Sequence, residues 1–148
     1  MALYEQVVSA LEEDHLKSAD SSKVVPSFFY SKNIPDISLA EYLGRLQTYC
    51  GFSDECIVAS LIYLDRVRKL YAEAIVNSHS LHRLLLASCV VACKFFEDDF
   101  CMNSHYACVG GIYLDEMNLL ESQFLILLDF NLVIIDEEYD AYFKRFNN

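Results

Sequence analysis

Apolar residues recur every three or four positions along most of the chain, with polar residues between them. Leu3, Val7 and Leu11 show the pattern at the start, and this spacing places apolar side chains on one face of an α-helix. The pattern predicts helices over residues 3–15, 38–50, 53–69, 81–96, 103–109, 115–129 and 136–146. The only β-like stretch, Leu132 to Ile135, is too short to form a sheet of its own. The sequence therefore predicts an all-α protein.

Residues with known capping preferences mark several of the helix ends. Ser38 followed by Glu41 forms a capping box, and Ser53 is a second N-cap residue. Gly110 and Gly111 come directly after a predicted helix, and two glycines are too few to cradle phosphates. We therefore interpret this pair as a helix C-cap.

The helix predicted over residues 81–96 is apolar around most of its circumference, as expected of a helix enclosed by others. Ser78 or Ser80 opens it. Residues 17–36 are rich in serine and contain both prolines, which predicts an irregular connection lying on the domain surface. The other loops are short, and short loops between helices favour a compact bundle.

Composition and charge narrow the partners that the protein could bind. Its 148 residues correspond to one domain, 54% of them are hydrophobic, and the formal net charge is −11. We expect no nucleic-acid partner and no anionic membrane surface, because both require a basic face. The acidity leaves two interpretations open, namely solubility and attraction of a basic partner.

The sequence also predicts where the protein resides. The longest apolar run, Leu84 to Cys93, is far shorter than the roughly 20 residues of a membrane span. Residues 1–10 lack the basic start and the apolar run of a secretory signal. We therefore expect the protein in the cytoplasm, the nucleus or both.

No set of residues completes a catalytic or metal-binding arrangement. Most of the six cysteines lie in apolar helical stretches, which predicts reduced and buried thiols. Cys89 and Cys93 are one helical turn apart, but zinc ligands usually lie near loops and this pair is mid-helix in an apolar run. The sequence therefore predicts a protein-binding domain with no enzyme activity, no catalytic residues, no cofactor and no metal.

Two stretches of the chain are far from generic. The first is Tyr-Leu-Asp-Arg at 63–66. The second, between Lys94 and Glu121, contains Lys-Phe-Phe-Glu-Asp, Tyr-Ala-Cys-Val-Gly-Gly-Ile and Glu-Met-Asn-Leu-Leu-Glu. Together they resemble the cyclin box, and within it the phosphate-response branch, the P/U-type cyclins. The resemblance covers about residues 34–132 and leaves room for a single box.

The resemblance implies a five-helix cyclin-box bundle. On this basis the box occupies residues 38–131. Residues 1–37 form an N-terminal amphipathic helix and a linker packed on the domain, and residues 132–148 form a C-terminal extension with a short helix.

A cyclin box implies a regulatory subunit that binds and activates a cyclin-dependent protein kinase, here of the phosphate- or nutrient-response or the cell-cycle type. In the family, a lysine late in the third helix and a glutamate in the fifth contact the kinase, and they correspond to Lys94 and Glu121. Further candidate partner-binding residues are Phe95, Phe96, Glu97, Asp98, Leu120 and Tyr63. For Tyr63, Phe95, Phe96 and Leu120, both the interface and the core are open as locations. Two alternatives stay open: a helical adaptor that binds a protein other than a kinase, and a purely internal Lys94–Glu121 ion pair.

The sequence departs from the family pattern in three places. Mitotic cyclins carry a substrate-docking motif at the start of the box, but residues 34–39 read Ile-Pro-Asp-Ile-Ser-Leu, which argues against docking of that kind. In the family, the arginine of that motif pairs with the aspartate of Tyr-x-Asp-Arg. Asp65 therefore needs another partner here, for which Arg45 is the candidate, or it has none. We favour a buried and paired Asp65 over a surface pair, because the preceding residues are nearly all apolar. Cys108 replaces a lysine of the P/U branch.

Overall fold

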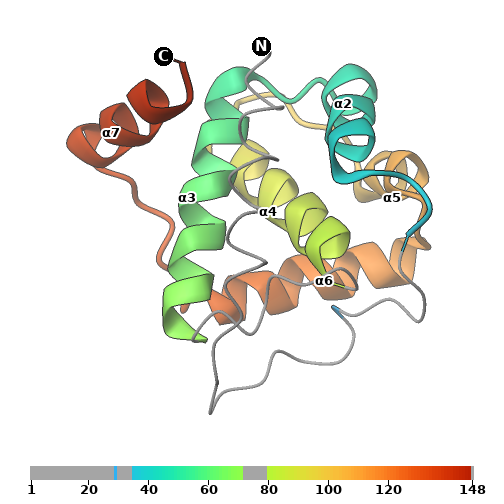
Figure 1. Ribbon diagram of the computed structural model, residues 1–148. Coiled ribbons are helices and arrows are strands. Elements are labelled where there is room, and N and C mark those ends of the chain that lie inside the picture. Colours follow the sequence, from blue (N-terminus) through green and yellow to red (C-terminus); the bar gives the residue numbers. More distant parts are fainter. Residues whose placement is uncertain (1–28, 30–34, 72–79, 148) are drawn as a thin grey trace.

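The computed structural model describes residue 29, residues 35–71 and residues 80–147. These ranges contain six α-helices and no strand, which confirms the all-α prediction. The helices are α2 (Leu39–Cys50), α3 (Asp54–Leu70), α4 (Leu81–Phe96), α5 (Asn103–Gly110), α6 (Leu114–Leu127) and α7 (Asp136–Asn147), as Figure 1 shows. The helix predicted over residues 3–15 and nearly all of the connection over 17–36 lie outside the described residues.

The capping residues act largely as the sequence predicts. The Ser38 hydroxyl accepts a hydrogen bond of 3.1 Å from the backbone N–H of Glu41 at the start of α2. The Ser53 hydroxyl does the same for the N–H of Cys56 at the start of α3, also at 3.1 Å. Ser80 precedes α4, but its side chain makes no capping hydrogen bond to that helix. Each capping bond satisfies one of the backbone donors that a helix leaves unpaired at its start.

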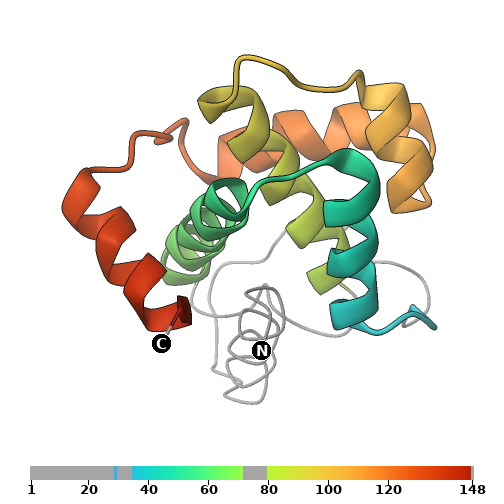
Figure 2. The same cartoon turned by 90° about the horizontal axis from the view of Figure 1, so that it is seen from above.

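Helix α4 occupies the centre of the bundle. It packs against α3, α6 and α2, and the two views of the ribbon show α3 and α4 inside the outer helices (Figures 1 and 2). Eleven of its residues are buried: Leu81, Leu84, Leu85, Leu86, Ala87, Ser88, Cys89, Val90, Val91, Ala92 and Cys93. This enclosure explains the apolar circumference predicted for the helix. None of the helices within residues 35–71 and 80–147 combines the length and apolar character needed to cross a membrane.

The two glycines at the end of α5 have different structural roles. Gly111 has a φ of +72° and caps the helix in the left-handed conformation, as predicted. Gly110 is buried, and a Cβ there would lie 2.5 Å from Cδ2 of Leu86. The Tyr42 hydroxyl donates a hydrogen bond of 2.8 Å to the Gly110 carbonyl. The absence of a side chain at Gly110 therefore lets α5 lie close to α2 and α4.

Side chains of α3 hold the segment that leads into α7. The Tyr63 hydroxyl donates to the Leu132 carbonyl at 2.7 Å. The Arg66 guanidinium donates to the carbonyls of Asn131 and Val133 and to the Glu138 carboxylate, at 2.8, 2.9 and 2.7 Å. The β-like stretch, Leu132 to Ile135, is thus not part of a sheet, and two of its carbonyls accept hydrogen bonds from α3 side chains. Helix α7 consequently lies beside α3, on the side of the bundle away from α5 (Figures 1 and 2).

All six cysteines are free thiols, as predicted. Four are buried, namely Cys50, Cys56, Cys89 and Cys93, whereas Cys101 is half-buried and Cys108 is exposed. Burial raises the pKa of both Cys50 and Cys89 from the ordinary value of 9.0 to about 12. These two thiols therefore stay protonated in the folded protein over the whole physiological range.

We expect the free energy of unfolding to fall as the pH rises above the ordinary thiol pKa of 9.0 toward the folded value of about 12 for Cys50 and Cys89. In that window the unfolded chain releases thiol protons that the folded chain retains, so alkali favours unfolding. Urea midpoints across the window measure the effect. Cys50→Ala combined with Cys89→Ala should lessen this slope without abolishing it, because burial raises the pKa of Cys56, Tyr42 and Tyr63 as well. Cys108→Ala, at an exposed position, should change the slope less. An equal slope in both variants would contradict this explanation.

Candidate functional site

The structure brings Lys94 and Glu121 together on the surface of the bundle. Lys94 lies in the last turn of α4, where a positive charge suits the helix dipole, and Glu121 lies midway along α6. The lysine Nζ is 2.8 Å from Glu121 Oε2 and 3.0 Å from Oε1. The two side chains remain 27% and 19% exposed, respectively. They form an ion pair within the chain that a partner can still reach.

Asn103, the first residue of α5, completes this polar cluster and was missed by sequence reasoning. Its Oδ1 accepts a hydrogen bond of 2.7 Å from Lys94 Nζ, while its Nδ2 donates to Glu121 Oε1 at 2.9 Å. The same Nδ2 also donates to Asn118 Oδ1 at 2.8 Å. Its position inside the Lys94–Glu121 stretch was the available signal in the sequence. An asparagine amide can both accept and donate hydrogen bonds, so it can contact a cation and an anion together. The amide fixes the orientation of both charged groups.

A small apolar hollow lies next to the ion pair. It has a volume of about 180 Å³ and is lined by Val91, Lys94, Phe95, Glu121, Leu125 and Leu132. Phe95 and Phe96 follow Lys94 and are each 46% exposed, with their rings in an edge-on arrangement. Exposed aromatic rings beside an apolar hollow are typical of the centre of a protein interface, whereas charged groups such as this ion pair belong to its polar rim.

A second ion pair joins the same two helices at a distance from the first. Arg83, in the first turn of α4, lies 2.8 Å from the carboxylate of Glu116, in the first turn of α6. Neither Arg83 nor Glu116 lines the hollow beside Lys94. The Arg83–Glu116 pair is therefore a matched comparison for Lys94–Glu121, since both connect α4 to α6.

Comparison with known proteins identifies the family. A family model described as "Cyclin" matches residues 2–132. The chain belongs to the cyclin family. Helices α2 to α6 of this cyclin all lie within the matched residues, whereas α7 follows them.

Relatives of this cyclin come from fungi and plants. It is 41% identical to PHO85 cyclin-7 of Saccharomyces cerevisiae over 77% of this chain and 44% of that protein. It is 42% identical to the PHO85 cyclin-like protein psl1 of Schizosaccharomyces pombe over 90% of this chain and 56% of that protein. Cyclin-U4-1 of Arabidopsis thaliana is 37% identical over 97% of this chain and 70% of that protein. These names confirm the resemblance to the P/U branch, and this cyclin spans about half the length of the two yeast relatives.

Two of the predicted partner-binding residues are part of the core of this cyclin. Tyr63 and Leu120 are fully buried, so the prediction that they contact a partner is corrected. The Tyr63 ring stacks beneath Phe96, with 6.4 Å between ring centroids. Tyr63 in α3 and Leu120 in α6 lie on the apolar stripe that each helix packs against α4. They therefore lie beneath the exposed residues around Lys94.

Glu97 and Asp98 lie beyond the end of α4, on the side nearer α3. Glu97 is half-buried, and its Oε1 accepts a hydrogen bond of 2.9 Å from the Ser53 hydroxyl. Asp98 is exposed. The predicted partner-binding residues of this cyclin thus divide between two surfaces, one around Lys94 and one around Glu97.

The pairing suggested for Asp65 is wrong. Its carboxylate lies 2.6 Å from Arg68, and its other oxygen accepts a short hydrogen bond from the Tyr142 hydroxyl of α7. The Asp65 side chain is 17% exposed, so it is paired but only partly buried. Arg45 instead lies over the Tyr42 ring, 5.3 Å from its centroid. The basic partner of Asp65, Arg68, is one turn away on the same helix. The family motif does not include this arginine.

The described part of this cyclin contains no candidate metal centre. Within residues 35–71 and 80–147, no group of three His, Cys, Asp or Glu side chains is placed to hold an ion. Cyclin family members regulate enzymes and are not enzymes themselves. The polar cluster around Lys94 presents hydrogen-bonding groups and charge on the surface of the bundle.

Proposed function

We propose that this cyclin binds a cyclin-dependent protein kinase and activates it. The observation that carries the proposal is the Lys94–Asn103–Glu121 cluster beside an apolar hollow at the exposed end of α4. The relatives support it, since two of them are named as PHO85 cyclins or PHO85 cyclin-like. The proposed partner is a cyclin-dependent kinase of the phosphate- or nutrient-response or the cell-cycle type. We propose that this cyclin binds it in the cytoplasm or the nucleus.

The geometry suits the binding of a helix. Lys94 can donate to a backbone carbonyl of the partner, and Glu121 can accept from a backbone N–H, both at charge-assisted strength. The hollow beside them can receive one apolar side chain from the same helix. If that helix is the regulatory helix of the kinase, its binding holds the kinase's ion pair and metal site in the active arrangement. The catalysis then belongs to the kinase, and this cyclin supplies no reacting group.

Capture of the kinase tests the proposal directly. Tagged protein should retain a cyclin-dependent kinase from extracts of its source cell, and mass spectrometry should identify that kinase. Purified kinase should then phosphorylate a peptide substrate faster when the cyclin is added. A stable partner without kinase activity would favour the alternative function, a helical adaptor, and would contradict the proposal.

A further inference from the structure

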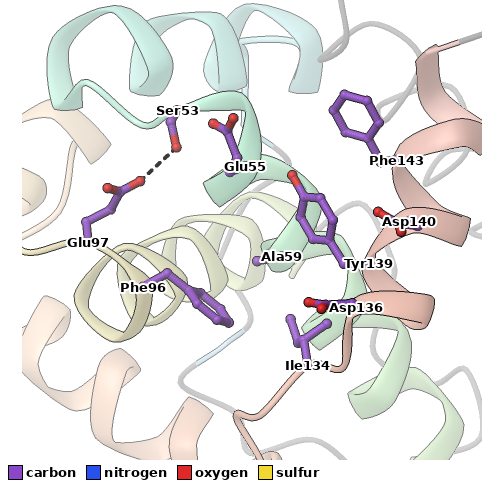
Figure 3. A pocket seen from close by; sticks show the side chains of 10 residues that line it. All are labelled: Ser53, Glu55, Ala59, Phe96, Glu97, Ile134, Asp136, Tyr139, Asp140 and Phe143. Carbon is purple, nitrogen blue, oxygen red and sulfur yellow. Dashed lines mark hydrogen bonds between the residues drawn. The ribbon is translucent and has the colours of Figure 1, made fainter.

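A second and larger groove lies on the other side of the end of α4. It is bounded by the start of α3, the end of α4 and one face of α7, and its volume is about 730 Å³ (Figure 3). Its lining residues are Ser53, Glu55, Ala59, Phe96, Glu97, Ile134, Asp136, Tyr139, Asp140 and Phe143. Phe96 and Glu97 belong to this groove, whereas Phe95 lines the hollow beside Lys94. Adjacent residues of α4 thus serve two different surfaces.

The groove combines aromatic rings with carboxylates. Tyr139 and Phe143 stack on each other with ring centroids 6.0 Å apart, and Phe96 lies across from them (Figure 3). Four acidic residues surround these rings: Glu55, Glu97, Asp136 and Asp140. Among the lining residues in the described part of the chain, none is basic. The groove therefore has apolar walls and a negative rim.

The Tyr139 hydroxyl is a buried polar atom without a partner. Its oxygen is shielded from solvent and makes no hydrogen bond in the structure, and Figure 3 shows it directed toward Glu55. Burial, together with the negative charges of Glu55, Asp54 and Asp140, raises the pKa of Tyr139. The hydroxyl therefore stays protonated and can both donate and accept. An unpaired buried hydroxyl costs free energy, which a bound donor would recover.

We propose that this groove binds a basic peptide segment of a second protein, with an arginine side chain between the aromatic rings and the acidic rim. A guanidinium suits the groove because it stacks on aromatic faces and pairs with carboxylates at the same time. Apolar neighbours in the peptide would cover Ile134 and Phe96. A nucleic acid would be repelled by the rim. The inference does not rest on the proposed kinase partner, because no residue that lines this groove also lines the hollow beside Lys94.

A peptide-binding experiment on the full chain, without kinase, tests the inference. The probe is a short fluorescein-labelled peptide that alternates arginine with leucine, and its counterpart carries citrulline at every arginine position. Fluorescence anisotropy should show saturable binding of the arginine peptide and roughly tenfold weaker binding of the citrulline peptide. Binding should weaken as salt is raised, because exposed charges are screened.

Variants locate the binding. Glu55→Gln combined with Asp140→Asn should weaken binding of the arginine peptide roughly tenfold, whereas Asp115→Asn, an exposed acid at the start of α6, should leave it unchanged. Tyr139→Phe should weaken binding about threefold without lowering the thermal midpoint, since no existing hydrogen bond is lost. Absence of saturable binding, equal binding of both peptides, or an equal loss in the Asp115→Asn control would each overturn the proposal.

Discussion

Replacing Lys94 or Glu121 with alanine should abolish capture of the kinase while leaving the fold nearly intact. Truncating one member of a hydrogen-bonded charge pair at an interface costs about 2–5 kcal/mol of binding free energy. That cost corresponds to about 30-fold to several thousand-fold in affinity. Within the free protein the two side chains are 27% and 19% exposed, so water still reaches both. Loss of the internal pair should therefore cost only about 1 kcal/mol of stability.

The Asn103 amide strengthens the expectation of a small effect on stability. In Glu121→Ala the lysine keeps its hydrogen bond to Asn103 Oδ1, and Nδ2 keeps its bond to Asn118. This variant therefore leaves no charge without a polar neighbour. Disruption of a buried ion pair is costly when it does leave such a charge. Thermal unfolding and kinase pull-downs on the same preparations separate the two effects.

Glu116→Ala is the matched control. It removes the carboxylate from the other ion pair between α4 and α6, whose contact distance of 2.8 Å equals that of Lys94–Glu121. We expect this variant to lose a similar small amount of stability and to bind the kinase normally. If Lys94→Ala and Glu121→Ala lost stability without losing affinity for the kinase, the ion pair would be purely internal and its assignment to the interface would be wrong.

Tyr63→Ala should cost about 3–5 kcal/mol of unfolding free energy, the largest effect on stability that we predict. The side chain is fully buried between α3 and the end of α4, and its hydroxyl holds the carbonyl of Leu132. Removing it leaves a cavity and an unpaired carbonyl. For a chain of this size the loss lowers the thermal midpoint by roughly 10 °C, which differential scanning calorimetry measures.

Tyr63→Phe separates packing from hydrogen bonding. It keeps the ring and removes only the donor to Leu132, so we expect a cost of about 1 kcal/mol. Tyr63 is buried beneath Phe96 and does not reach a partner itself. The alanine variant should therefore weaken kinase binding only as far as folding is lost. A Tyr63→Ala variant with wild-type stability and defective kinase capture would instead restore Tyr63 to the interface.

The sequence determined the helices in the described part of this cyclin and most of their ends. Ser38, Ser53 and Gly111 cap helices because their effect depends only on neighbouring backbone groups. The apolar circumference of α4 likewise required a central position. The caps depend on a few neighbouring residues, and the central position of α4 depends on how much of that helix's surface is apolar. A single sequence is therefore enough to infer both.

Only the tertiary structure decided which side of each helix is buried. Tyr63 and Leu120 looked like interface residues because apolar side chains in a core and in an interface have the same chemistry, and only packing against α4 distinguishes them. Asn103 and Asp65 gained their partners from the way helices cross. The acidic groove is formed where α7 lies beside α3, and the Arg66–Glu138 ion pair joins these two helices. These contacts join residues far apart in the chain, and helical periodicity carries no information about which of them meet.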